Sequence, residues 1–377
     1  MSQSIHAITM PRWGMTMSEG TLAAWLAGEG DVVAKGQDLM EIETTKITNV
    51  VESLADGVLR RRLAAPGTVA PVGALVGIIA GPEVMDREID AFIAARQGAR
   101  DQGTVAADAA DAGRLITIGP HSLHVVQAGS GNGIPMVFLH GFGSDSAIWA
   151  LNQEALAQGR ATLAFDLPAH GRSAPSVPGG DPAEMAAAIG QALGEIGVGR
   201  AHLVAHSFGA AVAMSMAERS LGLAASLTLI APVGFGAEIS SAFLDGFLAA
   251  ERRKPMKDVL AMLFADPAAM GSAMPDAVLR MKRLDGVAES LAAIAARLAE
   301  DGRQRLDLRP RLAALTLPVL VVWGEKDAIV SASQASGLPA QIGSCMIAHA
   351  GHLPMVEAAA QVNRLIADHI ARAEASS

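Results

Sequence analysis

The chain has 377 residues, which exceeds the length of most single domains, so we expect two domains or one large domain with an insertion. Hydrophobic residues make up 51% of the chain and charged residues 18%, a composition that excludes extensive disorder. The net charge of −9, without a long basic run, argues against nucleic acid as the main partner.

The N-terminal segment Met-Ser-Gln-Ser-Ile-His-Ala-Ile-Thr-Met-Pro has no basic region followed by an apolar run, so it predicts no signal peptide. The most apolar stretch, residues 221–237, contains Pro232 and several polar residues and is too short to cross a membrane. Cys345 is the only cysteine, which rules out an internal disulfide and fits a reducing compartment. We therefore expect a cytoplasmic protein with no membrane partner.

An internal repeat relates residues 20–42 to residues 57–79, at an offset of 37 and with eight identities in 23 positions. Each copy has short apolar runs separated by Gly-Asp or Gly-Thr turns, which is the pattern of short β-strands. Two copies of such a unit predict two small sheets related by a pseudo-twofold axis. We therefore expect residues 1–82 to form an all-β domain.

Lys46 follows the first copy of the repeat, within Glu-Ile-Glu-Thr-Thr-Lys-Ile-Thr-Asn at 41–49. Thr45 is compatible with a turn, and Ile42 and Val50 belong to the apolar runs on either side, so the pattern predicts a tight turn between two strands. A lysine at the tip of such a turn is held away from the fold. It is either a site of covalent modification or an ordinary surface charge.

Residues 1–82 resemble the lipoyl domains of 2-oxo-acid dehydrogenase complexes, in Met-Pro-Arg-Trp-Gly-Met-Thr-Met-Ser-Glu-Gly at 10–20 and in Glu-Thr-Thr-Lys at 43–46. The resemblance implies a flattened barrel with lipoate attached to Lys46 by a lipoate ligase. Thr45 departs from the commonest lipoyl turn, which has an aspartate immediately before the lysine. Biotin carriers share this fold but place methionine on both sides of the lysine, so the resemblance favours lipoate over biotin.

Residues 83–113 contain seven acids and three arginines, and we expect them to form a flexible acidic linker. Within them Ile89, Phe92 and Ile93 have helical spacing, which predicts a short helix that packs on its own domain or on a partner. A flexible chain of this length spans roughly 30 Å, from about 5–6 Å times the square root of the residue number. Lys46 would then reach a site on the domain that follows.

From residue 114 onward, strand-like and helix-like patterns alternate, which predicts a mainly parallel sheet covered by helices over residues 114–377. The eight predicted strands cover residues 115–118, 123–127, 136–139, 162–166, 202–205, 226–230, 319–323 and 345–347. Ligands bind at the carboxyl ends of the strands in open parallel sheets, so catalytic residues are expected there.

The fifth predicted strand leads into Ala205-His206-Ser207-Phe208-Gly209 and then into a helical run. This is the pattern of a nucleophile elbow, in which a serine occupies a strained turn with its hydroxyl exposed. The positions two before and two after the serine must be small, because strand and helix backbones pass close together. Gly209 meets this requirement, and Ala205 replaces the usual glycine with one extra methyl group. The alternative is that Ser207 is only a helix N-cap.

An acid and a histidine follow Ser207 in the chain order of the α/β-hydrolases. Asp327 comes after the seventh predicted strand, and His352 comes after the eighth. In a catalytic triad, His352 would take the serine proton and Asp327 would orient and stabilise the imidazolium. Glu325 is the second choice for the acid, and His206 is expected to be structural.

The run Leu-His-Gly-Phe-Gly at 139–143 ends the third predicted strand, and its glycines let backbone N–H groups face a substrate. We expect the amides of Phe142 and Phe208 to form an oxyanion hole. Asp166 and His170 are expected to be structural, with a second catalytic dyad as the alternative. No metal site is predicted.

A helical insertion at about 234–317 occupies the usual position of a lid. Within it lies a basic cluster, Arg252, Arg253, Lys254 and Lys257, followed later by Arg280, Lys282 and Arg283. A solvated helix face is the favoured interpretation of these residues. The alternative is a site that binds phosphate groups.

A lipoyl-like domain joined to an α/β-hydrolase-like domain resembles the dihydrolipoyllysine acetyltransferase component of acetoin dehydrogenase complexes, over nearly the whole chain. The resemblance implies transfer of an acetyl group from S-acetyl-dihydrolipoyl-Lys46 to coenzyme A in acetoin catabolism. It also implies two partner enzymes, a thiamine-diphosphate-dependent acetoin dehydrogenase component and a dihydrolipoamide dehydrogenase, and leaves self-association into a homo-oligomer open. The C-terminal end lacks the His-x-x-x-Asp-Gly motif of other 2-oxo-acid acyltransferases.

Two other functions stay open on sequence grounds. A serine hydrolase of thioesters or diketones, with the lipoyl domain as a fused carrier, would use water in place of coenzyme A. A non-enzymatic chain would use only the lipoyl carrier beside a degenerate hydrolase-like scaffold. The presence of Ser207, Asp327 and His352 together argues against this last possibility.

Overall fold

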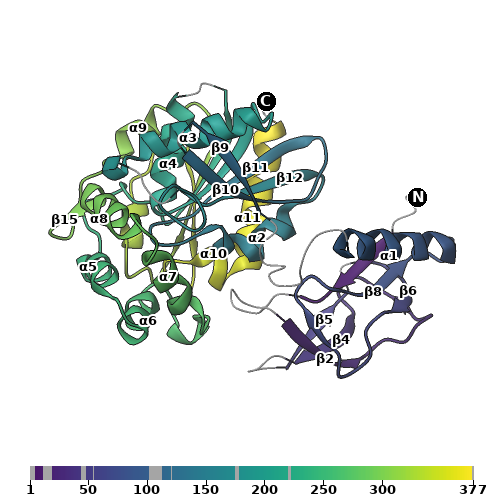
Figure 1. Ribbon diagram of the computed structural model, residues 1–377. Helices are drawn as coiled ribbons and strands as arrows, with labels where there is room; N and C mark the ends of the chain where they lie inside the picture. The colour runs from purple at the N-terminus through teal and green to yellow at the C-terminus, as the bar shows by residue number, and fades with distance from the viewer. Residues whose placement is uncertain are drawn as a thin grey trace. The chain divides into compact units, whose positions relative to one another are not determined.

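The computed structural model describes residues 5–11, 19–43, 48–53, 55–101, 113–119, 121–174, 178–219 and 222–375. The chain divides into two compact units, Met1–Ala112 and Gly113–Ser377, each of which has its own sheets (Figure 1). No helix within the described ranges is both long enough and apolar enough to cross a bilayer.

The first unit consists of two four-stranded antiparallel sheets, of order β1-β8-β6-β3 and β5-β4-β2-β7. The strands are β1 (Ile5–Thr9), β2 (Glu19–Trp25), β3 (Val32–Val33), β4 (Asp38–Glu43), β5 (Thr48–Glu52), β6 (Gly57–Arg62), β7 (Val69–Pro71) and β8 (Leu75–Ala80). Leu22 and its repeat partner Leu59 are both fully buried in one core, which also contains Ile42 and its partner Ile79. The repeated apolar positions therefore build the core, and the prediction of an all-β domain is confirmed.

β4 and β5 are antiparallel neighbours, and their pairing extends to Glu43 opposite Thr48. The connection between these two strands is residues 44–47, which include the predicted attachment residue Lys46. Lys46 itself lies outside the described residues.

A helix, α1 (Asp86–Asp101), follows the last strand of the first unit. Ile89, on its predicted apolar face, is fully buried in a cluster with residues of β8. Arg60 of β6 holds the start of the helix through an ion pair with Asp86 at 2.8 Å. The helix therefore packs on its own domain, which is one of the two arrangements that its spacing predicts. The segment expected to be a linker, residues 83–113, thus contains an ordered helix.

The second unit is built on an eight-stranded sheet of order β18-β17-β14-β13-β11-β12-β10-β9. β9 (Gly113–Ile118) and β10 (His121–Ala128) are antiparallel to their neighbours, and the other six strands run parallel. These six are β11 (Gly133–Leu139), β12 (Arg160–Phe165), β13 (Ala201–His206), β14 (Ala224–Ile230), β17 (Val319–Gly324) and β18 (Gly343–Ile347). All eight predicted strands of this domain are present, and the mainly parallel sheet is confirmed.

Helices cover both faces of this sheet (Figure 1). α3 (Pro182–Glu195) packs beside α4 (Phe208–Arg219), and α2 (Ala150–Leu156) packs beside α11 (Ala359–Ala375). β13, β14 and β17 are buried along their whole length, as expected for parallel strands between two helical layers.

The chain between β14 and β17 forms the expected helical insertion. Its elements are α5 (Ser241–Ala249), α6 (Arg253–Ala261), α7 (Met274–Lys282), α8 (Val287–Leu298), the short strands β15 (Ala299–Glu300) and β16 (Arg303–Gln304), and α9 (Arg309–Ala313). Figure 1 shows α5, α6, α7 and α8 grouped together at one side of the unit. Residues of α5, α6 and α8 line a pocket together with the ends of the sheet strands.

Candidate active site

Ser207 stands between β13 and α4, where the chain turns sharply from strand to helix. Its φ of +50° lies in the left-handed region, which a residue with a side chain adopts only where its surroundings enforce it. The Ser207 N–H donates to the Ile230 carbonyl at 2.9 Å, which ties the turn to β14. A Cβ atom on Gly209 would lie 2.5 Å from the His140 carbonyl oxygen, so only glycine fits where the helix passes the end of β11. This is the geometry of a nucleophile elbow.

Asp327 and His352 follow β17 and β18, and a hydrogen bond of 2.8 Å joins Asp327 Oδ2 to His352 Nδ1. The carboxylate is held by three further donors. Trp323 Nε1–H donates to Oδ2 at 3.0 Å, and the N–H groups of Ile329 and Val330 donate to Oδ1 at 2.8 and 3.0 Å. The Asp327 side chain is completely buried. The arrangement leaves His352 Nε2 as the nitrogen that can exchange a proton with a substrate.

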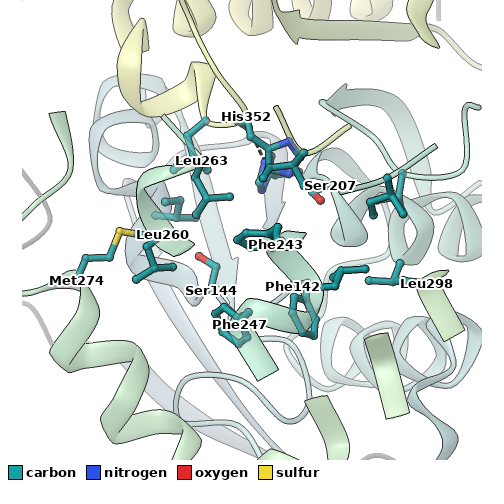
Figure 2. Close-up of a pocket in the computed structure, with 18 residues that line it drawn as sticks. Phe142, Ser144, Ser207, Phe243, Phe247, Leu260, Leu263, Met274, Leu298 and His352 are labelled. Atoms are coloured by element: carbon teal, nitrogen blue, oxygen red, sulfur yellow. Dashed lines mark hydrogen bonds between the residues drawn. The ribbon is translucent and has the colours of Figure 1, made fainter. Parts of the chain in front are cut away.

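Ser207 and His352 line the same pocket, whose other walls are mainly apolar (Figure 2). The walls come from Phe142, Ser144, Phe243, Phe247, Leu260, Leu263, Met274 and Leu298, among others. The cavity volume is about 30 Å³, which is room for about two water molecules. No hydrogen bond between described residues joins Ser207 to His352, a contact that in many enzymes tightens only when substrate binds. Glu325, the second choice for the acid, is exposed and does not line the pocket.

Phe142 and Phe208 belong to the two chain segments that border Ser207. Phe208 is the first residue of α4, so its N–H has no carbonyl partner within the helix. Gly141, beside Phe142, lies so close to the elbow that a Cβ atom on it would be 3.0 Å from Ser207 Cβ. The Phe142 N–H makes no hydrogen bond to any residue in the described part of the chain. Both amides are therefore available to a substrate oxygen.

His170 supports the loop after β11 and does not act with Asp166. Its Nε2 accepts the Gly143 N–H at 3.0 Å, and its Nδ1 lies 3.0 Å from the Pro168 carbonyl oxygen. Burial lowers the pKa of His170 to about 3, so the ring is neutral at physiological pH. Asp166 instead pairs with His124 Nδ1 at 2.9 Å. The alternative of a second catalytic dyad is therefore wrong, and the structural role is confirmed.

His206 precedes the nucleophile and supports the loop of His352. The two rings lie 4.7 Å apart between centroids, and His206 Nε2 donates to the His352 carbonyl at 2.9 Å. Burial lowers the pKa of His206 well below its usual value, so the ring remains neutral. These contacts fit the structural role expected of His206, which also lines the pocket.

The basic residues of the insertion do not form one cluster. Lys282 points inward and donates to three backbone carbonyls at the C-terminal end of α5, the closest being Phe247 at 2.6 Å. Burial lowers the pKa of Lys282. Arg253 pairs with Asp276 of α7 at 3.1 Å. The prediction that Lys282 belongs to a group of surface bases is therefore wrong. The exposed basic residues at the start of α6 and along it include Arg252, Lys254 and Lys257.

Phe247 of α5 is a pocket residue that the sequence interpretation missed. Its ring lies 5.1 Å from that of Phe142 between centroids, and it fills the space that a Cβ atom on Gly143 would enter. The only sequence signal was the pair Phe243 and Phe247 at helical spacing. The same signal fits any buried helix, so it could not single out the pocket.

The sheet order, the elbow and the Asp327–His352 pair define the second unit as an α/β-hydrolase domain. The family model described as "alpha/beta hydrolase fold" matches residues 134–359, and the one described as "Biotin-requiring enzyme", of the biotin/lipoyl type, matches residues 6–79. A solved meta-cleavage product hydrolase from Pseudomonas fluorescens has a TM-score of 0.61 and 18% sequence identity, covering 69% of this chain and 98% of that one. At this identity the likeness concerns the fold alone.

Two curated relatives match both domains in the same order. A dihydrolipoyllysine-residue acetyltransferase component of the acetoin cleaving system from Pseudomonas putida is 41% identical over 373 residues, 97% of this chain and 98% of that protein. The protein of the same name from Cupriavidus necator is 39% identical over 371 residues, 98% of both chains. The chain belongs to this family of acetoin-system acetyltransferase components, which confirms the resemblance seen in its sequence.

Proposed function

We propose that this chain transfers an acetyl group from a dihydrolipoyl thioester on Lys46 to coenzyme A, with Ser207 as the nucleophile. The observation that carries the proposal is the pocket shared by Ser207 and His352, with His352 held by the buried Asp327. The names of the two full-length relatives support dihydrolipoyllysine as the acetyl carrier and acetoin cleavage as the process.

Lipoate fits the first domain because β4 and β5 pair as far as Glu43 and Thr48. The connection that contains Lys46 thus joins the ends of a two-stranded ladder, the setting that the lipoyl resemblance requires. Lys46 would hold the group through an amide bond to its Nζ, made by a lipoate ligase. When bound, the group supplies a thiol that carries the acetyl unit as a thioester.

In the first step, His352 Nε2 removes the proton from Ser207 Oγ, and Oγ attacks the carbonyl carbon of the thioester. The N–H groups of Phe142 and Phe208 stabilise the negative charge that develops on the carbonyl oxygen. Asp327 keeps the protonated imidazole oriented. As the C–S bond breaks, His352 Nε2 would return its proton to the departing sulfur, and Ser207 Oγ would then carry the acetyl group as an ester.

In the second step, His352 takes the proton of the coenzyme A thiol, and the sulfur attacks the ester carbonyl. The same two amides stabilise the second oxyanion. The C–O bond to Ser207 breaks and Oγ regains the proton from His352, so acetyl-CoA leaves and the enzyme returns to its starting state.

The partners follow from the chemistry on either side of this step. A thiamine-diphosphate-dependent acetoin dehydrogenase component would acetylate the arm, and a dihydrolipoamide dehydrogenase would reoxidise the dithiol left after transfer. The relatives' designation as components of an acetoin cleaving system supports such an assembly. The cytoplasm is its proposed location.

The test uses the lipoylated full-length chain with S-acetyl-dihydrolipoamide as donor and coenzyme A as acceptor, and quantifies acetyl-CoA and free acetate. Acetyl-CoA should be the main product, and Ser207→Ala should lose at least about 10³-fold in rate. Acetate as the main product at saturating coenzyme A would instead identify the hydrolase of thioesters or diketones. A wild-type rate for Ser207→Ala would exclude the acetyl-serine intermediate.

A further inference from the structure

Glu357 links the loop of His352 to the helical insertion. It ends α10 (Pro354–Glu357), which begins two residues after His352. Glu357 Oε2 accepts the Gly351 N–H at 2.7 Å, and Oε1 accepts the Ala265 N–H at 2.8 Å. One carboxylate therefore holds together two segments that are far apart in sequence.

The two segments also touch directly. The His352 N–H donates to the Leu263 carbonyl at 2.9 Å. A Cβ atom on Gly351 would lie 2.6 Å from the Ala265 nitrogen, so the two backbones are in van der Waals contact. Residues 263–266 thus form a strap, as we name it, that lies against the backbone of the histidine loop.

The strap is part of the pocket wall beside the catalytic base. Leu263 lines the pocket together with Leu260 of α6, His352 and Leu353 (Figure 2). Burial raises the pKa of the Glu357 carboxyl. The hydrogen bonds from the backbone N–H groups of Gly351 and Ala265 oppose this rise, because they stabilise the charged form. The carboxylate thus occupies a partly desolvated place where its hydrogen-bond donors are backbone amides.

The geometry points to Glu357 as a positioning residue that keeps the strap closed over His352 and so limits the access of water to acetylated Ser207. This inference rests on the proposed acetyl transfer. The acetyl ester has two fates at the same carbonyl carbon. Attack by the coenzyme A thiol yields acetyl-CoA, whereas attack by water yields acetate; in both, the C–O bond to Ser207 breaks and Oγ regains a proton. A strap that opens admits water and favours acetate.

The test compares Glu357→Ala and Glu357→Gln with wild type in the full-length lipoylated chain. The matched control is Asp258→Asn, which removes an exposed acid from α6 without touching the strap. S-acetyl-dihydrolipoamide and a fixed concentration of coenzyme A are supplied, and acetate and acetyl-CoA are counted. We expect the acetate share of the product to rise about tenfold in Glu357→Ala, because the half-buried N–H groups of Gly351 and Ala265 lose their acceptor. Glu357→Gln should show a smaller rise, since its amide oxygen can still accept one N–H.

Hydrogen exchange supplies a readout that does not depend on turnover. Peptides that cover residues 263–266 and Gly351 should exchange faster in both Glu357 variants than in wild type and Asp258→Asn. An acetate share and an exchange rate equal to those of Asp258→Asn overturn the inference, even if kcat falls. If wild type itself forms no acetyl-CoA, the proposed function fails, and exchange at Ala265 alone then decides whether Glu357 holds the strap.

Discussion

At the scale of the residue, the site depends on a carboxylate that has no contact with water. Both oxygens of Asp327 are occupied: Oδ2 by His352 and Trp323, Oδ1 by two backbone N–H groups. A buried charge with a full set of donors cannot rotate without leaving a donor unpaired. The imidazole of His352 is therefore fixed with Nδ1 toward the acid.

Asp327→Asn should fold but lose about 10⁴-fold in kcat, because an amide NH₂ group would face a donor and reverse the tautomer of His352. Acetyl-CoA formation measures the rate, and circular dichroism checks the fold. Glu325→Gln, which removes a nearby exposed acid, is the control and should change kcat by less than about twofold. Equal rates in the two variants would remove Asp327 from the mechanism.

The residues that could be predicted from sequence are those tied to strand ends. Ser207, Asp327 and His352 each follow a strand, so their chain order carries information about their position in the sheet. Glu357 and Lys282 could not be predicted, because their functional contacts are with backbone groups 92 and 35 residues away. Such a contact depends on how the insertion packs, which no local pattern records.

At the scale of the element, α5 is held at its C-terminal end by a residue from another helix. The carbonyls of the last turn of a helix lack intrahelical partners and carry partial negative charge. Lys282 of α7 supplies an ammonium group to three carbonyls there, and its Nζ lies 5.4 Å from the centroid of the Phe247 ring. Lys282 therefore fixes the place of Phe247 in the pocket wall.

Phe247→Leu should widen the pocket and favour longer acyl groups. We expect the kcat/KM ratio for butyryl over acetyl dihydrolipoamide to rise about tenfold, the scale of one or two methylene groups in an apolar pocket. Phe138→Leu is the matched control, because Phe138 is buried against Trp149 and does not line the pocket. An equal change of the ratio in both variants would show that pocket size at Phe247 does not set acyl length.

The elements themselves were predictable to different degrees. The strands of both domains have short apolar runs between turn residues, and α1 has a clear apolar face, so their positions follow from the sequence. For the insertion, the sequence predicts only the approximate limits, about 234–317, and the helical character. It does not predict the individual helices. The contact between Arg253 and Asp276 joins α6 to α7 at the surface, and both side chains are exposed, as the favoured interpretation of a solvated helix face expects for Arg253.

At the scale of the whole molecule, the C-terminal helix is tied to the sheet by Glu374. Its carboxylate pairs with Arg160 of β12 at 2.7 Å and lies 3.2 Å from His202 Nε2 of β13. The hydrogen bond from Arg160 is the main reason that the pKa of Glu374 falls from 4.5 to about 2. The stabilisation from this group is therefore present above about pH 4.5 and is lost as the pH falls toward 2.

Glu374→Gln should lower the Tm of the second domain by about 2–4 °C at pH 7, and the difference from wild type should shrink toward pH 2. Differential scanning calorimetry across this range measures the effect. Glu300→Gln, which removes an exposed acid 3.6 Å from Arg305, should give no such difference at any pH. A gap that stays constant from pH 7 to pH 2 would show that ionisation of Glu374 is not its source.

The two domains should depend on each other only through the arm on Lys46. Lys46→Ala should carry no lipoyl adduct by intact mass, and acetyl-CoA formation by way of the arm should cease. With free S-acetyl-dihydrolipoamide as donor, the rate of acetyl-CoA formation by Lys46→Ala should stay within about twofold of that of an unlipoylated wild type. The reason is that Lys46 and Ser207 belong to separate compact units. An adduct that persists in Lys46→Ala would place the attachment on another lysine.

The origin of the pocket walls has an evolutionary consequence. Ser207, Asp327 and His352 stand on loops at strand ends of the sheet, whereas Phe243, Phe247 and the strap belong to the insertion between β14 and β17. Mutations in the insertion can therefore change which acyl group or acceptor is admitted without altering Ser207, Asp327 or His352, the groups proposed to make and break bonds. An ancestral scaffold of this kind can acquire a new acceptor by remodelling this insertion, while the serine at the elbow remains intact throughout the change.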